Sequence, residues 1–536
     1  MEPSRRNFIL FRDWALFIFS HLLTIAIYAV ALKWLNSLLP GLFTPSWWII
    51  RLVIAHFSYL IYSHFQRSLT LPPGPPPMII FGNSPCVSVV TPEVTFLEYR
   101  ELYGPVFTLH LGKPTVVLAS HETIHQGLIT EGPHTAGRSS NESFTLFTND
   151  RENGDGIILA MRQKWRDMRS EITRFMGGLY GDRIDEIIRY HTRLLETEML
   201  KISEHKGLID LRDPLAGAIA NVIQQITIGK TFMFQDQEFQ DQLRDINAVV
   251  KEIMTGEVFL VNRFPVLKML PEGLLRKWTN YKKSGFRLQQ WFRTILEDHL
   301  INRHQGDYMS YMVERKESGK AMFKDLSIIL TCGDIWTGGM ETTVTTLRWG
   351  IIYLLKNMEV QEKCHREIVE VFGEEEPEMR RMLETPYVRA TISEIQRLAN
   401  VLPWAIPHKT LATCTIGGYT IPENTDLIPG IGAVLNDPEI FEDPKKFDPE
   451  RFLDKSGNYV TLEKFRPFGL GPRSCLGERI ARTELYMIFC TLVQNFKFYL
   501  NENDPVPSTD RVIGGITAPP QPFAVRLEYR NIRPVK

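Results

Sequence analysis

The sequence contains few cysteines, and no two of them lie close together. Only six occur among 536 residues, and none forms a Cys-x-x-Cys pair. This spacing excludes zinc ribbons and dithiol redox motifs. It suits a reducing compartment, in which most thiols are buried and inert, although one of them can still serve as a metal ligand.

The chain also lacks an excess of charge of either sign. Its 61 Lys and Arg residues nearly balance 62 Asp and Glu residues, so no broad basic surface is expected and no nucleic acid partner is predicted. Hydrophobic residues make up 44% of the chain and charged residues 23%, as in globular proteins with a sizeable core. Wholesale disorder is therefore excluded.

The longest apolar runs lie near the N-terminus. Trp14 to Leu35 is a run of 22 mostly apolar residues, which is long enough to cross a hydrocarbon core. A second run, Trp47 to Phe65, carries Arg51, His56 and His64. A second membrane span and a helix lying in the interface are equally compatible with this second run.

Arginines precede the first apolar run, whereas Asn36 to Ser46 holds no charge. The positive-inside rule therefore places the N-terminus in the cytoplasm. If the catalytic domain is also cytoplasmic, the chain must return across the bilayer as a hairpin. A cleaved signal peptide does not fit so long a run, and a mitochondrial presequence would be rich in Arg and Ser rather than apolar.

A proline-rich segment follows, with the sequence LPPGPPP. Its prolines predict a semi-rigid spacer in the polyproline conformation. We therefore predict a membrane anchor over residues 1–70, a hinge over 71–77 and one catalytic domain over 78–536.

Periodicity indicates the class of that domain. Helical patterns dominate its middle, as in Asp325 to Leu355 and Val360 to Phe372. Short strand-like runs occur at Val106 to Leu111 and Thr115 to Ala119. The expected fold class is mainly α with small β-sheets.

The sharpest motif surrounds Cys475 and reads FGLGPRSCLG from Phe468 to Gly477, with a helix-like segment directly after it. Glycines let the backbone approach a flat ligand, and the helix N-terminus favours a thiolate. Arg473 can donate hydrogen bonds to a carboxylate. A surface turn with a buried cysteine would explain a lone Cys, but Phe-x-x-Gly-x-Arg-x-Cys-x-Gly fixes the residue at five of ten positions.

This pattern matches the haem-binding signature of the cytochrome P450 family, which the chain resembles from the proline-rich segment to the C-terminus. The resemblance implies the cytochrome P450 fold and a haem b cofactor with Cys475 as thiolate ligand. It also implies a monooxygenase that uses O2 and electrons from NADPH, delivered by NADPH-cytochrome P450 reductase, with cytochrome b5 as a further candidate partner. Phe468, Gly471, Arg473 and Gly477 would belong to the haem site.

A second motif, GGMETT, begins at Gly338 inside a long helical pattern. Two adjacent glycines cost about 1 kcal/mol each relative to alanine, and their small size would let a ligand approach the helix. Glu341 and Thr342 offer an acid followed by a hydroxyl, which can relay protons. A pair of helix-packing glycines with surface threonines is the alternative. The motif resembles the oxygen-activating helix of the family.

Three further motifs resemble those of the family. Trp165 and Arg169 lie four apart on an expected helix, and His408 follows the segment PWAIP. The resemblance implies that these three residues, with Arg473, hold the haem propionates. Glu394 and Arg397 lie three apart and, with Arg451, resemble the family's Glu-Arg-Arg network, to which we assign a structural role.

Longer stretches, such as those beginning at Leu211, Gln242, Thr331 and Arg511, resemble members of the family that oxidise sterol side chains. The resemblance implies that the terminal side-chain carbon of a keto sterol is oxidised to give a bile-acid-like steroid hormone, at the endoplasmic reticulum membrane with the catalytic domain in the cytoplasm. By analogy, the pocket would be lined by uncharged residues: Gly338, Gly339, Ala405, Ile406, Ile516 and Thr517.

Other functions remain as alternatives to the sterol oxidase. One is a monooxygenase of another apolar substrate, such as a fatty acid or a xenobiotic. Another is a haem-thiolate isomerase, against which the Glu341-Thr342 pair argues, and a third is a haem sensor without catalysis. For the monooxygenase, the basic residues Arg479 and Arg482 are the expected docking site of the reductase.

Overall fold

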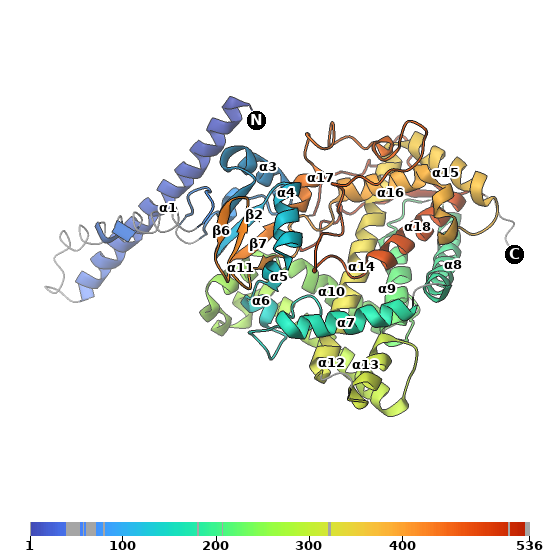
Figure 1. Ribbon diagram of the computed structural model, residues 1–536, viewed down its shortest axis with the longest axis horizontal. Helices are drawn as coiled ribbons and strands as arrows, with labels where there is room; N and C mark the ends of the chain where they lie inside the picture. Colours follow the sequence, from blue (N-terminus) through green and yellow to red (C-terminus); the bar gives the residue numbers. More distant parts are fainter. Residues whose placement is uncertain are drawn as a thin grey trace. The chain divides into compact units, whose positions relative to one another are not determined.

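The structure is a computed structural model that describes residues 2–38, 54–56, 58–59, 71–78, 81–179, 182–205, 207–319, 323–512 and 515–530 (Figure 1). It divides into two compact units, each assembled from separate stretches of chain. Unit 1 comprises Met1–Ser139, Trp404–Val434 and Leu470–Pro472. Unit 2 comprises Ser140–Pro403, Leu435–Gly469 and Arg473–Lys536. The residues of the predicted catalytic domain are therefore shared between the two units.

Unit 1 is built on a five-stranded sheet with the order β1-β2-β7-β4-β3. The strands are β1 (Val106–His110), β2 (Pro114–Leu118), β3 (Gly137–Arg138), β4 (His408–Lys409) and β7 (Asp426–Pro429). All neighbours are antiparallel except β2 and β7, which are parallel. The predicted strands at Val106 and Thr115 are thus confirmed to within one residue. A separate hairpin pairs β5 (Cys414–Ile416) with β6 (Tyr419–Ile421).

Short helices surround this sheet. They are α3 (Pro92–Tyr103), α4 (His121–His125), the π-helical turn η2 (Gln126–Thr130), α5 (Gly132–Thr135), the 3-10 turn η1 (Ser84–Cys86), and α17 (Ile431–Leu435), which ends one residue into unit 2. α3 begins at Pro92, whose fixed φ suits a first helical position, and ends at Gly104, whose φ is 93°. Phe96 and Tyr99 of α3 are fully buried and contact Phe107 of β1.

The proline-rich segment is bound to the sheet by hydrogen bonds. The backbone N–H of Thr108 in β1 donates to the carbonyl of Pro73 at 2.8 Å, and its hydroxyl donates to the carbonyl of Pro72 at 2.8 Å. A Cβ on Gly74 would lie 2.0 Å from the Thr108 carbonyl oxygen, so only glycine fits there. The segment can bind to the sheet because proline carbonyls still accept hydrogen bonds, and its role as a hinge between anchor and catalytic domain stays a prediction.

The N-terminal helix α1 (Pro3–Leu38) contains a stretch, Pro3–Ala31, that is long and apolar enough to cross a membrane. Two charged residues of its first turns, Arg5 and Asp13, contact α3, beside which these turns lie in Figure 1. Most of the second apolar run falls outside the described residues. His56, one of its described residues, lies 2.7 Å from His21 of α1, measured between ring nitrogens.

Unit 2 is mainly helical, so the predicted class is confirmed. Its α-helices are α6 (Glu142–Thr145), α7 (Arg162–Leu179), α8 (Asp182–Glu204), α9 (Arg212–Ile228), α10 (Gln237–Glu252), α11 (Gly256–Arg263), α12 (Arg276–Asn302), α13 (Tyr308–Glu317), α14 (Asp325–Lys356), α15 (Met358–Phe372), α16 (Pro386–Ala399) and α18 (Glu478–Asn495). Short 3-10 turns are η3 (Pro265–Met269), η4 (Glu272–Leu274), η5 (Met379–Glu384) and η6 (Pro449–Phe452), and β8 (Phe496–Tyr499) pairs with β9 (Arg526–Tyr529).

The helix α14 is the centre of unit 2 and confirms the predicted helix from Asp325. It packs against α9, α12, α16 and α18 (Figure 1). Its second half is buried around most of its circumference, which is why its sequence is apolar on all sides rather than amphipathic. The predicted helix ending at Phe372 is confirmed as α15.

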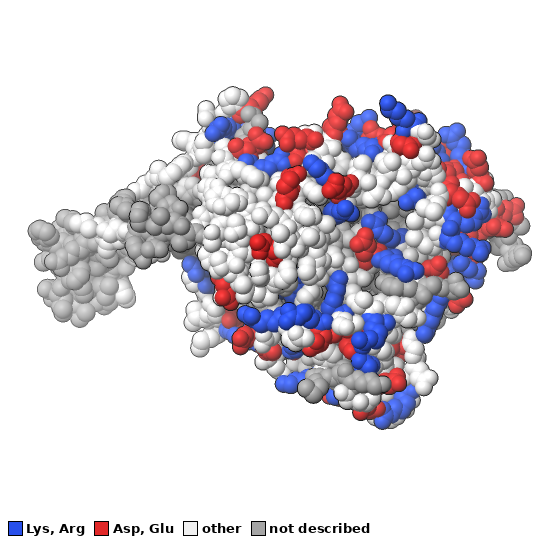
Figure 2. Space-filling view, in the orientation of Figure 1, with Lys and Arg blue, Asp and Glu red and all other residues white. Residues whose placement is uncertain are grey.

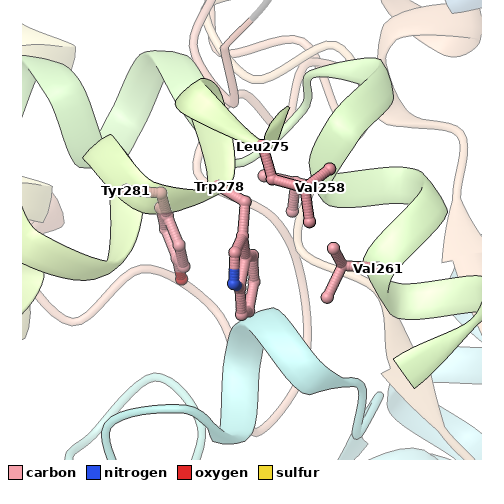
Figure 3. Packing of buried hydrophobic residues seen from close by; sticks show 5 residues of the cluster. All are labelled: Val258, Val261, Leu275, Trp278 and Tyr281. Carbon is pink, nitrogen blue, oxygen red and sulfur yellow. The ribbon is translucent and has the colours of Figure 1, made fainter. Parts of the chain in front are cut away.

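A compact apolar cluster joins α11 to the start of α12. Its members are Val258, Val261, Leu275, Trp278 and Tyr281, and Figure 3 shows Trp278 between the tyrosine and the two valines. The Tyr281 hydroxyl donates to the carbonyl of Ser143 at 2.8 Å. The cluster therefore holds α11 against the start of α12.

On the face shown in Figure 2, basic and acidic side chains are interspersed, as the balanced composition predicts.

Candidate active site

The cysteine loop immediately precedes α18. The Cys475 N–H donates to the carbonyl of Phe468 at 2.9 Å, which closes the loop. Gly477 is the N-cap residue of α18, so the thiol lies at the positive end of that helix. Gly469 has a φ of 79°, which favours glycine. The thiol group is thus presented by a tight turn at a helix start, as the motif predicts.

Cys475 differs from the other cysteines in its exposure. It is exposed, whereas the remaining five are buried. Although the side chain is accessible, protein atoms around it reduce the hydration of the thiol and so raise its pKa, and the Gly477 amide, Arg169 and Arg482 oppose that effect. A coordinated metal ion deprotonates a thiol outright, so these groups would support a thiolate ligand. The buried cysteines Cys332 and Cys490 have a pKa well above the usual value, because burial disfavours their charged form.

Three polar side chains of unit 2 gather beside this loop. Arg169, on α7, donates to the carbonyl of Ser474 at 3.0 Å. The Arg473 guanidinium lies over the Trp165 ring, 4.0 Å from its centre, and donates to the carbonyls of Ile157 and Ala160. Trp165 and Arg169 are one helical turn apart, so the predicted Trp-x-x-x-Arg pair does share a face of α7.

These residues fit a haem group. The indole N–H of Trp165 is buried and has no hydrogen-bond partner among the described residues. A buried N–H of this kind needs an acceptor, and a propionate carboxylate would supply one beside two arginines. Cys475 would provide the thiolate ligand, and Trp165, Arg169 and Arg473 would hold the propionate.

The glycine pair of α14 proves to have two different uses. A Cβ on Gly338 would meet no atom within 4 Å, so that side of the helix is open to a ligand. A Cβ on Gly339 would lie 2.7 Å from the Ile223 side chain of α9. Gly339 is therefore a helix-packing glycine that contacts α9, and its place in the substrate pocket stays a prediction.

The acid and hydroxyl of this motif lie next to each other in α14. Glu341 is buried, and burial raises the pKa of its carboxyl, while Arg212, Arg348 and Thr345 oppose the rise. Thr342 is half-buried, and its hydroxyl donates to the carbonyl of Gly338 at 2.7 Å. That bond places the hydroxyl on the open side of the helix, next to the glycine with free space.

The structure brings together Glu394, Arg397 and Arg451. Both carboxylate oxygens of Glu394 accept from Arg397, at 2.7 and 2.8 Å, and neither residue is exposed to solvent. Arg451 Nε lies 3.4 Å from Glu394 Oε1. Arg397 also donates to the carbonyls of Leu435 and Pro444, at 2.9 and 2.8 Å. The arginine thus ties α16 to the segment after α17.

The remaining predicted haem residues lie in unit 1. His408, in β4, is buried, and its Nδ1 lies 2.9 Å from the carbonyl oxygen of Thr135. Gly471 has a φ of 76°, and a Cβ there would lie 2.0 Å from the carbonyl oxygen of Leu128. Contact with η2 therefore requires glycine at this position, and the role of Gly471 in the haem site stays a prediction.

The predicted pocket residues are placed in both units. In unit 1, Ala405 and Ile406 are half-buried, and Ala405 adopts a φ of 50°, a conformation that alanine rarely takes. In unit 2, Ile516 is half-buried and donates its N–H to the carbonyl of Val250 at 3.1 Å, while Thr517 is buried. None of these four side chains is charged.

Two acids near these residues were missed by sequence reasoning. Asp334 of α14 accepts from the N–H groups of Ile157 and Ile158, at 2.8 and 2.9 Å, and so holds the loop whose carbonyl accepts from Arg473. Burial raises the pKa of Asp334 to about 7. Glu484 of α18 is buried near Thr343, and burial raises its pKa well above the usual value. An acid inside an otherwise apolar helical stretch was the available signal for both.

Comparison with known proteins gives one family model and several relatives that match most of this chain. The family model described as Cytochrome P450 matches residues 72–527. A 3-ketosteroid oxygenase of Caenorhabditis elegans is 66% identical over 534 residues, which cover 99% of this chain and 93% of the relative. Cytochrome P450 2K4 of Oncorhynchus mykiss is 32% identical over 80% of this chain and 85% of its own length. Cytochrome P450 2C5 of Oryctolagus cuniculus is 32% identical over 84% of this chain and 92% of its own length.

Proposed function

Because this chain belongs to the cytochrome P450 family, we propose that it oxidises the terminal side-chain carbon of a keto sterol through alcohol and aldehyde to the carboxylic acid. The observation that carries the substrate class is the 66% identity, over nearly the whole chain, to a relative named 3-ketosteroid oxygenase. Each hydroxylation would insert one atom of O2 into a C–H bond and reduce the other to water with two electrons from NADPH and two protons.

The haem group, once bound through Cys475, supplies the oxygen activation. The residues of the chain would serve it in two ways. Trp165, Arg169 and Arg473 would hold its propionate, and His408 is proposed for the same task. Glu341 and Thr342 would move protons to the open side of α14, where Gly338 leaves room.

The uncharged residues proposed for the pocket suit a large apolar ligand. Ala405, Ile406, Ile516 and Thr517 carry no cationic group that would anchor a fatty-acid carboxylate. Binding the sterol rings away from the iron would let only the tip of the side chain reach it, which is how position determines the site of attack.

The proposed function is tested by incubating the full-length protein with reductase, NADPH and a panel of keto sterols and fatty acids. Mass spectrometry is expected to detect the alcohol, aldehyde and acid of a keto sterol. The Cys475→Ala variant is the matched control and should give no product. Efficient fatty-acid hydroxylation without any oxidised sterol would refute the sterol assignment and leave the haem chemistry intact.

Replacing Thr342 by alanine is expected to preserve haem binding but to divert most NADPH electrons into hydrogen peroxide. Loss of one positioned proton donor typically costs about 10²–10⁴-fold in a proton-transfer step, whereas reduction of the iron would continue. The measurement is the ratio of sterol product to NADPH consumed. Thr346→Ala, one turn further along α14, is the control. It removes a threonine hydroxyl that donates to a helix carbonyl in the same way, that of Thr342, but that has no part in the proposed relay. Unchanged coupling in Thr342→Ala would contradict the relay.

The family relationship implies a reductase as the electron donor. We propose that it docks near Arg479 and Arg482 at the start of α18, directly after the cysteine loop. Arg479 is exposed, and Arg482 pairs with Glu478 at 2.9 Å and lies 4.8 Å from the centre of the Phe468 ring. Cytochrome b5 is proposed as a second donor that uses the same surface.

The apolar helix α1 associates the chain with a membrane. We propose the endoplasmic reticulum, with the catalytic domain in the cytoplasm. The exposed apolar side chains of Val266, Met269 and Leu274, on η3 and η4, support additional contact with the membrane surface.

The first turns of α1 also support a topology for the anchor. Arg5 pairs with Glu98 of α3, and the Tyr99 hydroxyl donates to Asp13 at 2.8 Å. Asp13 is 1% exposed, so this contact is a buried one. Residues that contact α3 must lie on the same side of the membrane as α3. The N-terminus would then be cytoplasmic, and the apolar segments would form a hairpin.

Glycosylation tags test this hairpin. A tag at the N-terminus is expected to stay unmodified, because that end would be cytoplasmic, whereas a tag between Asn36 and Ser46 should be modified in the lumen. Electrophoretic mobility with and without glycosidase is the measurement, and a tag at the C-terminus is the control. Modification of the N-terminal tag would rule out the proposed topology.

A further inference from the structure

The buried acid Glu341 has one oxygen, Oε2, without a hydrogen-bond partner among the described residues. The guanidinium Nη2 of Arg212 lies 4.0 Å from this oxygen. Burial disfavours a charged carboxylate, and a cation at this distance favours it. Arg212 therefore bears directly on whether Glu341 carries a proton.

Arg212 is also placed to connect Glu341 with solvent. It is the first residue of α9, and about one third of its side chain (31%) is exposed, against 10% for Glu341. Its own N–H donates to Asp210 at 2.9 Å, and its side chain lies 3.4 Å from Asp213. Asp210 and Asp213 are exposed, so the guanidinium lies between one solvent-exposed carboxylate, that of Asp213, and the buried carboxylate of Glu341.

A further contact links Arg212 to the region proposed for the substrate. Its Nη2 donates to the side-chain oxygen of Asn247, on α10, at 2.7 Å. One turn further along α10, the Val250 carbonyl accepts from the N–H of Ile516 at 3.1 Å. Thus α10 contacts a pocket residue at one point and the partner of Glu341 at another.

We infer that Arg212 is a positioning residue for the proton relay, which favours the ionised form of Glu341 against the effect of burial and holds its carboxyl toward the solvent entry formed by Asp210, Asp213 and the start of α9. Protons would enter at this surface, pass to Glu341 and continue to Thr342. The inference rests on the proposed relay role of Glu341. It adds a route for protons from solvent to Glu341. It also adds a link from Arg212 through Asn247 to α10, the helix that contacts Ile516.

The other charges near Glu341 do not replace Arg212. Arg348, on α14 itself, is buried and lies 3.8 Å from Asp210, and it favours the ionised form of Glu341 as well. The carboxylates of Asp210 and Asp213 have the opposite sign and partly screen both arginines. Removing Arg212 leaves one cation and two acids, so the pKa of Glu341 must rise.

The test measures the protonation of Glu341 directly in the full-length, haem-loaded protein. Infrared spectra across a pH series identify the C=O stretch of its protonated carboxyl as the band that Glu341→Gln removes. An opposite charge at about 4–6 Å lowers a carboxyl pKa by roughly 1–3 units, and partial exposure favours the low end. We therefore expect Arg212→Gln to move the midpoint upward by about 1 unit.

Two further variants separate charge from structure. Arg212→Lys retains the cation and should keep a midpoint near that of the unaltered protein. Arg244→Gln removes an exposed arginine of α10 that pairs with Asp241, and it should change nothing. The carbon monoxide difference band of each variant checks that the haem site is intact. An unchanged midpoint in Arg212→Gln overturns the inference.

Turnover then tests the link to catalysis. With reductase, NADPH and cholestenone as the sterol probe, the pH at which coupling changes should move upward in Arg212→Gln by the same amount as the infrared midpoint. A moved midpoint with unaltered coupling would overturn the solvent route and the relay role of Glu341. Uncoupling in Glu341→Gln, with a normal midpoint and normal coupling in Arg212→Gln, would overturn only the role of Arg212.

Discussion

Replacement of Cys475 by alanine is expected to abolish all monooxygenase activity and the red-shifted absorption band of the ferrous carbon monoxide complex. Both depend on thiolate ligation of the haem iron, and Cys475 is the exposed cysteine, at a helix start, in a loop closed by its own N–H. The measurement is the difference spectrum of dithionite-reduced protein with and without carbon monoxide.

The buried cysteines are the controls for this result. Cys490 lies further along α18, and burial keeps its thiol neutral by raising its pKa well above the usual value. Cys490→Ala should therefore retain the band, with at most a modest loss of stability from a small cavity. Persistence of the band in Cys475→Ala, or its loss in Cys490→Ala at full haem content, would show that the ligand has been misassigned.

The second large effect is expected from Arg397→Ala. This change leaves Glu394 fully buried and without its bidentate partner, and it removes the donor to the carbonyls of Leu435 and Pro444. Breaking a buried ion pair from one side costs about 3–5 kcal/mol of unfolding free energy. We expect this variant to accumulate poorly and to lose its haem at lower urea concentration than the unaltered protein.

Two variants make that measurement specific. Arg397→Lys keeps the charge but cannot form the fork that contacts both oxygens, so its loss should be smaller but still clear. Arg380→Ala removes an arginine whose side chain is 79% exposed and should change stability by no more than about 0.5 kcal/mol. If Arg397→Ala unfolded at the same urea concentration as Arg380→Ala, the network would have no structural importance.

Sequence patterns predicted the parts of this molecule that depend on neighbours in the chain. The helix from Asp325 followed from its periodicity, and the strands at Val106 and Thr115 followed from runs of β-branched and apolar residues. The turn around Cys475 was predictable because ten consecutive residues determine it. In each case the relevant contacts lie within one element or one loop.

Contacts between distant segments were not predictable in the same way. Gly338 and Gly339 are adjacent and identical in type, yet one faces open space and the other faces Ile223, which lies more than a hundred residues away in sequence. Arg212 and Asp334 acquire their importance only through partners on other elements. A single sequence carries no record of which helix packs against which.

The attachment of the proline-rich segment to β1 bears on how the enzyme meets a membrane-bound electron donor. Pro72, Pro73 and Gly74 of segment 71–77 contact Thr108, so this part of the segment is held on β1. Two proteins that diffuse in one bilayer lose rotational freedom when they dock, and that loss is smaller if one of them already samples few orientations. A segment held in this way would lower the entropic cost of docking to a donor in the same bilayer, and it would also shorten the distance over which the domain can move.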